Sequence, residues 1–270
     1  MKKILIFSLP VLALCLASCK KDKVDTWRDD SPIIDFNDTR LLKALIEISD
    51  MYGDYPHSDG NRVYRTFKDM NGDGKVSEKE ASRVQYLDLS GYKIRNFDEI
   101  VYFSSLEILY CQNNELRDID ISKNTGLKDL NCMGNSLTAL DVSKNSSLES
   151  LSCKLNELTS LDVSGCSRLK SLSCENNKLT RLVISGCGSL EELSCSSNSI
   201  STIDVSECTE LKELDCSYNE IKTLDLSNNK YLESVTCHEN PLDAIILYEY
   251  ADLPETFLET YRNIIKGYQW

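Results

Sequence analysis

Apolar residues recur in a fixed register along most of the chain. Leucine, replaced in places by valine or isoleucine, returns at the first, fourth and eleventh places of a unit that repeats every 21 residues. One polar residue separates the fourth place from a cysteine at the sixth, and this period-two alternation predicts a short, half-buried strand in each unit. The units begin at Leu106, Leu127, Leu148, Leu169, Leu190, Leu211 and Leu232.

The first half of each unit reads L-x-x-L-x-C-x-x-N-x-L, with an asparagine at the ninth place of every copy. This pattern resembles the repeat of the leucine-rich repeat family over residues 84–252, where an imperfect first copy begins at Val84. The resemblance implies a repeat solenoid in which the leucines and the cysteine point inward. The asparagines would turn the chain inward and bond backbone groups of neighbouring coils. They are Asn114, Asn135, Asn156, Asn177, Asn198, Asn219 and Asn240.

The second half of each unit follows the same pattern, as in LTSLDVSGC from Leu158. Two strand-like pieces in each turn predict a solenoid that is mainly β, with strands on both sides. Because two strands need similar spacing, we expect a flattened and weakly curved stack rather than a deep horseshoe. The second column of polar turn residues uses asparagine and cysteine interchangeably, at Asn124, Asn145, Cys166, Cys187, Cys208 and Asn229.

The chain contains 12 cysteines, and those at the sixth place of each unit should act as small buried hydrophobes. Adjacent coils bring them within disulfide range, but parallel side chains in register have unfavourable torsion angles for a bridge. We therefore expect free thiols. Zinc binding is the alternative, and stacked identical columns disfavour it because they do not build a tetrahedron.

A solenoid exposes its apolar core at both ends unless each end is capped. Residues 39–83 are expected to form the N-terminal cap, which begins with a helix over residues 39–52. The apolar face of that helix would consist of Leu41, Leu45 and Ile48, with Leu42 and Ile46 beside them. Residues 253–270 predict a small helical C-terminal cap. Its inward residues would be Phe257, Tyr261 and Ile264.

Within the N-terminal cap, the string DMNGDGKVSEKE resembles the calcium loop of the EF-hand family place for place. Calcium takes about six to eight oxygen ligands from such a curled backbone. The resemblance implies one structural calcium ion, since the loop is single and regulatory EF-hands are usually paired. The alternative is a solvated turn without metal. The implied ligands are Asp69, Asn71, Asp73, the backbone carbonyl of Lys75, Ser77 and Glu80.

Residues 1–18 combine two early lysines with an apolar run that is too short to span a bilayer comfortably, which indicates a signal peptide. The ending Leu-Ala-Ser-Cys resembles the lipobox of bacterial lipoproteins and implies lipidation of Cys19. An ordinary secretory signal is the alternative. Residues 19–38 are polar and are interpreted as a tether. Similar leucine-rich repeat lipoproteins occur in Bacteroidetes, which implies a lipid-anchored protein of the bacterial cell envelope, at the outer membrane, facing the periplasm or the outside.

Two outward columns carry charge. At the second place of the 21-residue unit, acidic and basic residues alternate from one unit to the next. Opposite charges on neighbouring strands stabilise strand pairing by roughly 0.2–1 kcal/mol. We interpret this column as register control, with a zwitterionic ligand track as the alternative. It consists of Glu107, Lys128, Glu149, Lys170, Glu191, Lys212 and Glu233. The other column stacks aspartates in successive units. Their carboxylates should repel one another unless they are hydrogen-bonded, for instance to nearby serines, or countered by cations. It consists of Asp120, Asp141, Asp162, Asp204 and Asp225.

The exposed places of the first strand are mostly small and polar, so the sequence predicts no apolar docking patch on this face. Larger side chains interrupt the pattern at four places, and we take them as candidate ligand contacts. They are Tyr110, Met133, Leu155 and Tyr218.

Composition narrows the function. The 270-residue chain has 30 basic and 43 acidic side chains, a formal net charge of -13, and no basic cluster, which argues against nucleic-acid binding. No nucleophile elbow, phosphate loop or paired catalytic histidine is recognisable, so we expect no enzyme, with a hydrolase using paired carboxylates as a weaker alternative. The resemblance implies a binding scaffold for a protein or glycan ligand. A structural envelope lipoprotein without a specific ligand is the other alternative.

Overall fold

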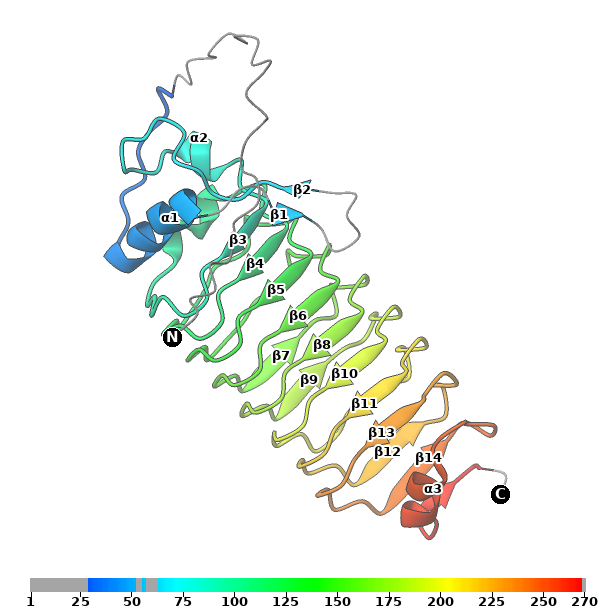
Figure 1. The fold of residues 1–270 in the computed structure, drawn as a ribbon. Coiled ribbons are helices and arrows are strands. Elements are labelled where there is room, and N and C mark those ends of the chain that lie inside the picture. The colour runs from blue at the N-terminus through cyan, green and yellow to red at the C-terminus, as the bar shows by residue number, and fades with distance from the viewer. Residues whose placement is uncertain (1–28, 52–54, 57–62, 269–270) are drawn as a thin grey trace, which may run out of the picture.

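The computed structural model describes residues 29–51, 55–56 and 63–268, which form an elongated stack of coils (Figure 1). The expected repeat solenoid is confirmed. Its longest sheet has eight parallel strands, each paired with the strand one unit further along the chain. These strands are β3 (Tyr86–Asp88), β4 (Ile108–Tyr110), β5 (Asp129–Asn131), β6 (Ser150–Ser152), β8 (Ser171–Ser173), β10 (Glu192–Ser194), β11 (Glu213–Asp215) and β13 (Ser234–Thr236).

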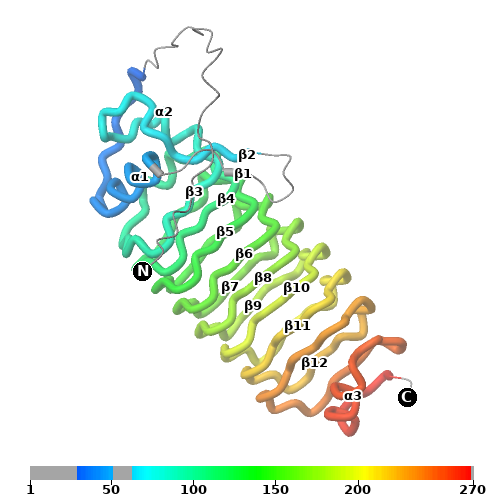
Figure 2. The backbone as a smooth tube through the Cα atoms, viewed as in Figure 1, coloured from blue at the N-terminus to red at the C-terminus, as the bar shows by residue number. Residues whose placement is uncertain are grey.

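The opposite side of the coil also contains parallel strands, which confirms a strand on both sides, although not in every coil. One sheet pairs β7 (Ser160–Asp162) with β9 (Arg181–Val183). A second has the order β12 (Thr223–Leu226), β14 (Ala244–Leu247) and β15 (Ile265–Lys266). The corresponding segments at residues 118–121, 139–142 and 202–205 have no strand. The trace shows coils of similar width on both sides and a nearly straight stack (Figure 2).

The space between the two sides is filled by the repeating apolar columns. The leucines at the first and fourth places are buried in successive coils, as with Leu148, Leu151, Leu169 and Leu172, which are at most 1% exposed. Because every coil places the same side chain at the same point, the core is one continuous stripe that runs from cap to cap. Burial of such side chains stabilises the fold by about 1.5–3 kcal/mol each.

The first asparagine column holds the coils together through both ends of its amide group. The Nδ2 group of Asn156 donates to the carbonyl oxygens of Cys132 and Cys153, each at 3.0 Å. Its Oδ1 atom accepts from the backbone N–H of Leu137, also at 3.0 Å. All members of this column accept such an N–H bond from the preceding coil. This is the inward backbone bonding that the sequence predicts.

The second column uses only the donor end of the amide. The Nδ2 group of Asn145 donates to the carbonyls of Ile121 and Asn124, at 3.1 and 2.9 Å. The Oδ1 atoms of Asn124, Asn145 and Asn229 are buried and accept no hydrogen bond from any residue that the structure describes. Since no acceptor is needed here, a thiol can replace the amide, and the Sγ atom of Cys166 lies 3.9 Å from the carbonyl of Val142. The interchange of asparagine and cysteine in this column therefore has a physical basis.

The described cysteines are buried free thiols, and those at the sixth place line the core as small apolar groups. Burial raises the pKa of the Cys132 thiol to about 12. A thiol with such a raised pKa carries almost no thiolate at neutral pH and is chemically unreactive. The column is therefore part of the packing.

The N-terminal cap contains α1 (Thr39–Met51), the short pair β1 (Tyr55–Pro56) and β2 (Val63–Tyr64), and α2 (Glu78–Ala81). The 3₁₀ helix η1 (Asp98–Tyr102) follows β3. The predicted apolar face of α1 is confirmed, because Leu41, Leu45 and Ile48 are at most 5% exposed. Helix α1 lies at the end of the stack next to β3 (Figure 1), and these three residues belong to the continuous apolar core.

Part of the segment that the sequence assigns to the tether packs against this cap. Ile33 forms an antiparallel bridge with Ser77, and Ile34 is buried. Asp38 precedes α1, and although burial opposes its charge, hydrogen bonds from Arg40 and the Arg95 backbone hold the pKa of its carboxyl well below the usual value. Residues 29–38 thus contribute to the cap, and a tether would lie before them.

The C-terminal cap contains the predicted helix, α3 (Glu255–Tyr261), which buries Phe257 and Leu258. Tyr261 and Ile264 are partly buried against the same core. The following strand β15 adds a parallel edge to β14, an element that the sequence analysis did not predict. No helix in the described part of the chain has both the length and the apolar character needed to cross a bilayer.

Candidate functional site

The eight-stranded sheet presents one solvent-facing surface, which we call the outer face and define by two rows of side chains. The rows are set by the strand register, and each advances one unit per coil. Neither row contains a lysine or an arginine. The first row is Tyr86, Ile108, Asp129, Ser150, Ser171, Glu192, Glu213 and Ser234. The second row is Asp88, Tyr110, Asn131, Ser152, Ser173, Ser194, Asp215 and Thr236.

The C-terminal half of the outer face is slightly hollowed. A shallow depression of about 210 Å³ crosses β8, β10, β11 and β13. Its polar lining consists of hydroxyl and carboxylate groups, and Ser171 Oγ donates to Glu192 Oε2 at 3.1 Å. Asp215 accepts two bonds from Ser217, from its N–H at 3.0 Å and its hydroxyl at 2.6 Å. This surface can accept hydrogen bonds and attract cations.

One edge of the outer face is formed by a column of residues with left-handed backbone. The second residue after each sixth-place cysteine has a positive φ, including Asn113, Gly134 and Asn176. Glycine and asparagine suit this conformation, whereas bulky residues are disfavoured there. Leu155 and Tyr218 nevertheless occupy it, with φ of 56° and 53° and exposed fractions of 50% and 54%. Strained residues of this kind concentrate at functional sites.

The four predicted contact residues do not form a single patch. Tyr110 is half-buried, its ring lies 5.7 Å from that of Tyr86, and its hydroxyl donates to Asp129 at 2.9 Å. Met133 is also half-buried. Leu155 and Tyr218 share the exposed edge but are three coils apart, roughly 14 Å at 4.8 Å per strand. The sequence therefore identified two exposed edge residues and two that are half-buried.

The alternating charge column forms ion pairs between some of its neighbours. Lys128 Nζ lies 2.5 Å from Glu107 Oε2, and Lys212 Nζ lies 2.5 Å from Glu191 Oε2. The hydrogen bond from Lys212 lowers the pKa of Glu191, and the same bond raises the pKa of Lys212. Lys170 is exposed and is not part of these pairs. Pairs between adjacent coils are consistent with a role in strand register.

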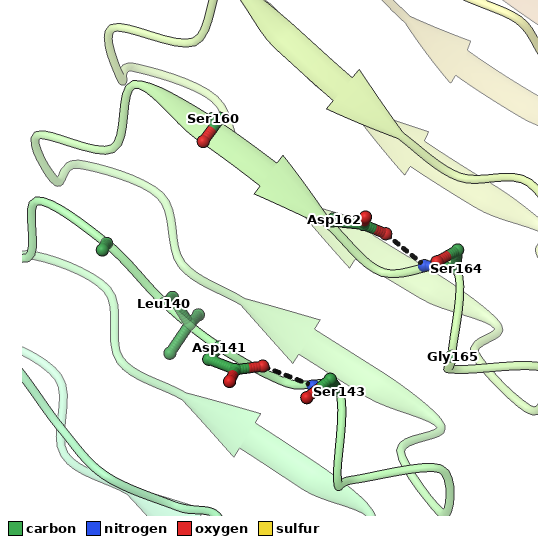
Figure 3. Close-up of a pocket in the computed structure, with 8 residues that line it drawn as sticks. Leu140, Asp141, Ser143, Ser160, Asp162, Ser164 and Gly165 are labelled. Carbon is green, nitrogen blue, oxygen red and sulfur yellow. Dashed lines mark hydrogen bonds between the residues drawn. The ribbon is translucent and has the colours of Figure 1, made fainter.

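On the opposite side, the stacked aspartates engage the chain itself. Figure 3 shows Asp141 and Asp162, whose Oδ1 atoms accept from the N–H of Ser143 at 2.8 Å and of Ser164 at 3.0 Å. Hydrogen bonds from Ser164 lower the pKa of Asp162. The other members of the column make the same bond. The hydrogen bonding that this row requires is therefore present, and it closes a turn in each coil.

These turns border a shallow hollow of about 340 Å³ between two coils, and the labelled side chains in Figure 3 surround it. Its lining is Ala139, Leu140, Asp141, Ser143, Ser160, Asp162, Ser164 and Gly165. Because one oxygen of each aspartate already closes a turn, the row is explained by local structure.

The predicted calcium loop is curled around the carboxylate of Asp69. The Oδ1 and Oδ2 atoms of Asp69 accept from the N–H groups of Gly72 and Gly74, each at 2.8 Å. Both glycines have positive φ, of 71° and 72°, which a side chain would strain. The loop thus folds back on its first residue.

The end of the loop is tied to the start of α2. Ser77 is the N-cap of this helix and forms a capping box with Glu80. The buried Glu80 carboxylate also accepts from the N–H of Met70 at 2.8 Å, so the last predicted ligand reaches back to the beginning of the loop. Ser77 Oγ donates to Asp29 at 2.5 Å, which brings a further carboxylate to the same place.

The donor set of the loop suits a hard cation, because its ligands are all oxygen atoms. Within the described residues, however, no three acidic, imidazole or thiol groups converge as a metal cluster. The oxygens accept from the loop instead, as when Lys75 N–H and Asn71 Nδ2 donate to Asp73 at 2.9 and 3.0 Å. Calcium binding stays a prediction. The predicted lipidation site, Cys19, lies outside the described residues.

Comparisons with known proteins concern the repeats. A family model described as leucine-rich repeats in two copies matches residues 188–228. No curated protein matches the chain. A solved leucine-rich repeat protein from Leptospira interrogans is 20% identical, with a TM-score of 0.54, over 72% of this chain and 62% of that one. The chain therefore spans less than two thirds of that protein's solved chain.

Two further solved structures are similar. Internalin C2 from Listeria monocytogenes is 19% identical, with a TM-score of 0.61, over 77% of this chain and 86% of that one. YopM, a leucine-rich effector protein from Yersinia pestis, is 22% identical, with a TM-score of 0.50, over 63% of this chain and 57% of that one. The matched repeats and these similar solenoids support the leucine-rich repeat family, and this chain has the leucine-rich repeat solenoid fold.

Proposed function

We propose that this protein is a non-catalytic binding scaffold of the bacterial cell envelope, and that its outer face recognises a protein or glycan ligand. Leucine-rich repeat proteins are typically interaction modules, which supports a binding role. The observation that carries the proposal is the outer face itself. It is a long, mostly polar surface rich in hydroxyls and carboxylates, and no cap segment among the described residues crosses its middle strands. Its edge exposes Leu155 and Tyr218.

The test uses the purified full chain on protein and glycan arrays, followed by binding curves. Saturable binding to particular array members is expected, and the variant Ser173→Arg, which places a large side chain on the outer face, should abolish it. Ser160→Arg on β7 makes the same change on the opposite side and should leave binding intact. Uniform absence of binding would favour the alternative, a structural envelope lipoprotein without a specific ligand.

Anchoring is a second part of the proposal. The Leu-Ala-Ser-Cys ending supports lipidation of Cys19, and several acyl chains would be needed for stable attachment because one chain binds membranes only marginally. Cys19→Ala should move the protein from the detergent-soluble membrane fraction to the aqueous fraction. Unchanged partitioning would refute the lipoprotein assignment.

The third part concerns metal. We infer that Asp69, Asn71, Asp73, Ser77 and Glu80, together with the carbonyl of Lys75, hold one structural calcium ion. The curl around Asp69 and the contact of Glu80 with Met70 support this inference. When bound, the ion would supply positive charge to a loop rich in carboxylates. The loop residues would stabilise the cap that covers the first coil, since Glu80 is only four residues from Val84.

A further inference from the structure

Charge is unevenly distributed over the outer face. The middle of both rows consists of serines, whereas the carboxylates of Glu192, Glu213 and Asp215 gather on the adjacent strands β10 and β11. The strand register places Glu192 directly beside Glu213. Adjacent strands are about 4.8 Å apart, and like charges directly opposite one another destabilise strand pairing. This arrangement contrasts with the neighbouring charge column, where acids and bases alternate.

The acidic group is not ion-paired within the part of the chain that the structure describes. None of the ion pairs between described residues involves Glu192, Glu213 or Asp215. Lys212, which precedes Glu213 in the chain, is bound to Glu191 instead. The face therefore retains a local negative potential, which a cationic ligand would neutralise.

An aromatic side chain stands at the edge of the same coil. Tyr218 follows Asp215 by three residues, and its ring packs edge-on against His238, with centroids 5.0 Å apart. It remains 54% exposed in a left-handed conformation that disfavours bulky residues. An exposed tyrosine ring attracts the guanidinium or ammonium group of a ligand through its π-face. The carboxylates and the ring thus favour the same ligand chemistry.

The shape of the surface indicates the size of the ligand. The depression has a volume of about 210 Å³ and is open, whereas enclosed small-molecule sites measure about 300–1,000 Å³. It crosses four strands, a span of roughly 14 Å at 4.8 Å per strand. An extended peptide of about four or five residues covers that length at 3.3 Å per residue. The surface therefore fits a segment of chain laid across the strands.

We propose that the C-terminal half of the outer face docks a cationic segment of a protein partner, whose arginine or lysine side chains lie over Glu192, Glu213 and Asp215 and against the Tyr218 ring. This inference rests on the proposed binding function and narrows it to a class of partner. Charge complementarity provides specificity and speeds association more than it adds affinity. The unfavourable Glu192–Glu213 pairing is relieved when the partner is bound.

The test measures binding of a labelled peptide of alternating arginine and serine to the full chain, by fluorescence anisotropy at about 0.15 M salt. The triple variant Glu192→Gln, Glu213→Gln, Asp215→Asn should weaken binding by about tenfold or more. The matched control Asp120→Asn, Asp141→Asn, Asp204→Asn removes the same charge from the opposite side. Its asparagines can still accept the serine N–H bonds, and binding should change by less than about twofold.

Two single variants test the tyrosine ring and the carboxylate pair separately. Tyr218→Ser should weaken peptide binding about threefold, and serine suits this place because Ser197 has the same left-handed conformation one coil earlier. Glu213→Gln should weaken binding and also raise the melting temperature of the free protein, since it removes one of two adjacent like charges. This variant keeps the proposal testable if the triple variant fails to fold.

The outcomes distinguish this inference from the proposed function. If the triple variant and its control lose peptide affinity equally, the peptide responds to net charge alone, and the docking site is refuted. If an array glycan or protein binds saturably but does not displace the cationic peptide, the cationic partner class is refuted and the scaffold function still stands. Failure to bind any array member saturably would refute the proposed function itself.

Discussion

Replacing one asparagine in each of the two columns with cysteine separates two roles that look alike in the sequence. Asn156 belongs to the first column, where the amide both donates and accepts. Asn145 belongs to the second, where its Oδ1 atom is buried without a partner. We predict that Asn156→Cys destabilises the protein strongly, whereas Asn145→Cys costs little or no stability, although both residues are at least 92% buried.

The magnitudes follow from the bonds that each change breaks. Asn156→Cys leaves the N–H of Leu137 without an acceptor, which costs about 1–3 kcal/mol. It also replaces two N–H donors by one weak S–H donor, at a further cost of about 0.5–1.5 kcal/mol. The expected loss in free energy of unfolding is therefore about 1.5–4.5 kcal/mol.

Asn145→Cys suffers the same donor loss of about 0.5–1.5 kcal/mol, but it also removes an unsatisfied buried oxygen that costs the wild type about 1–3 kcal/mol. The two contributions oppose each other, so the variant should range from about 0.5 kcal/mol less stable to about 2.5 kcal/mol more stable than wild type. Cys166 occupies the same place one unit later, which indicates that the coil accommodates a thiol there.

The assay is urea unfolding followed by circular dichroism, in reducing buffer so that adjacent thiols stay unpaired. Midpoints are compared only if the denaturant dependence is unchanged, because repeat stacks can lose cooperativity. Equal destabilisation by the two variants would refute the reasoning, as would a larger loss in Asn145→Cys. Either result would mean that the Oδ1 atom of Asn145 is stabilised by a contact that is absent from the structure.

Three further predictions concern other features. Lys170→Glu places an acid between two acids of the alternating column and should lower the free energy of unfolding by about 1 kcal/mol, an effect that shrinks in high salt. Leu155→Asn relieves a bulky residue in left-handed backbone and should raise stability by about 1 kcal/mol, measured by urea unfolding. Calcium at about ten times its dissociation constant should stabilise the cap by about 1.4 kcal/mol. Chelation should then lower the melting temperature, and Asp73→Ala or Glu80→Ala should abolish that response.

Each of these has a result that would contradict it. Stability of the Lys170→Glu variant that does not depend on salt would count against the charge column. If Leu155→Asn is less stable than wild type, packing of the leucine outweighs the backbone strain. A wild-type melting temperature that ignores both calcium and chelator would mean that the loop is only a turn, and the predicted ligands would have no metal role.

Much of the architecture was predictable because each coil repeats the same local signals. The alternation of leucine and cysteine places the strands of the long sheet, and its spacing of 21 residues sets their register, as the pairing of Leu130 with Leu151 confirms. The apolar face of α1 and the helix at the C-terminal cap follow from periodicity over a few turns. These features depend on residues that are close in sequence, so the sequence contains enough to predict them.

Other features depend on contacts between distant residues, and only the tertiary structure decides them. The bridge between Ile33 and Ser77, which attaches residues 29–38 to the cap, joins a polar segment that reads as a tether. Strand β15 forms only because β14 offers it an unpaired edge. Likewise, β7 and β9 pair while the equivalent segment at residues 202–205 does not, although all share one sequence pattern.

The candidate site divides in the same way. The repeat alone places Glu192, Glu213 and Asp215 on the exposed side of their strands, and it identifies Tyr218 as an unusual exposed residue. That Tyr218 has left-handed backbone, and that Glu192 and Glu213 form no ion pair with the described lysines, could not be inferred from spacing. The left-handed backbone belongs to the turn that every coil makes, and ion pairing depends on where neighbouring coils direct their side chains. Residue spacing alone specifies neither of them.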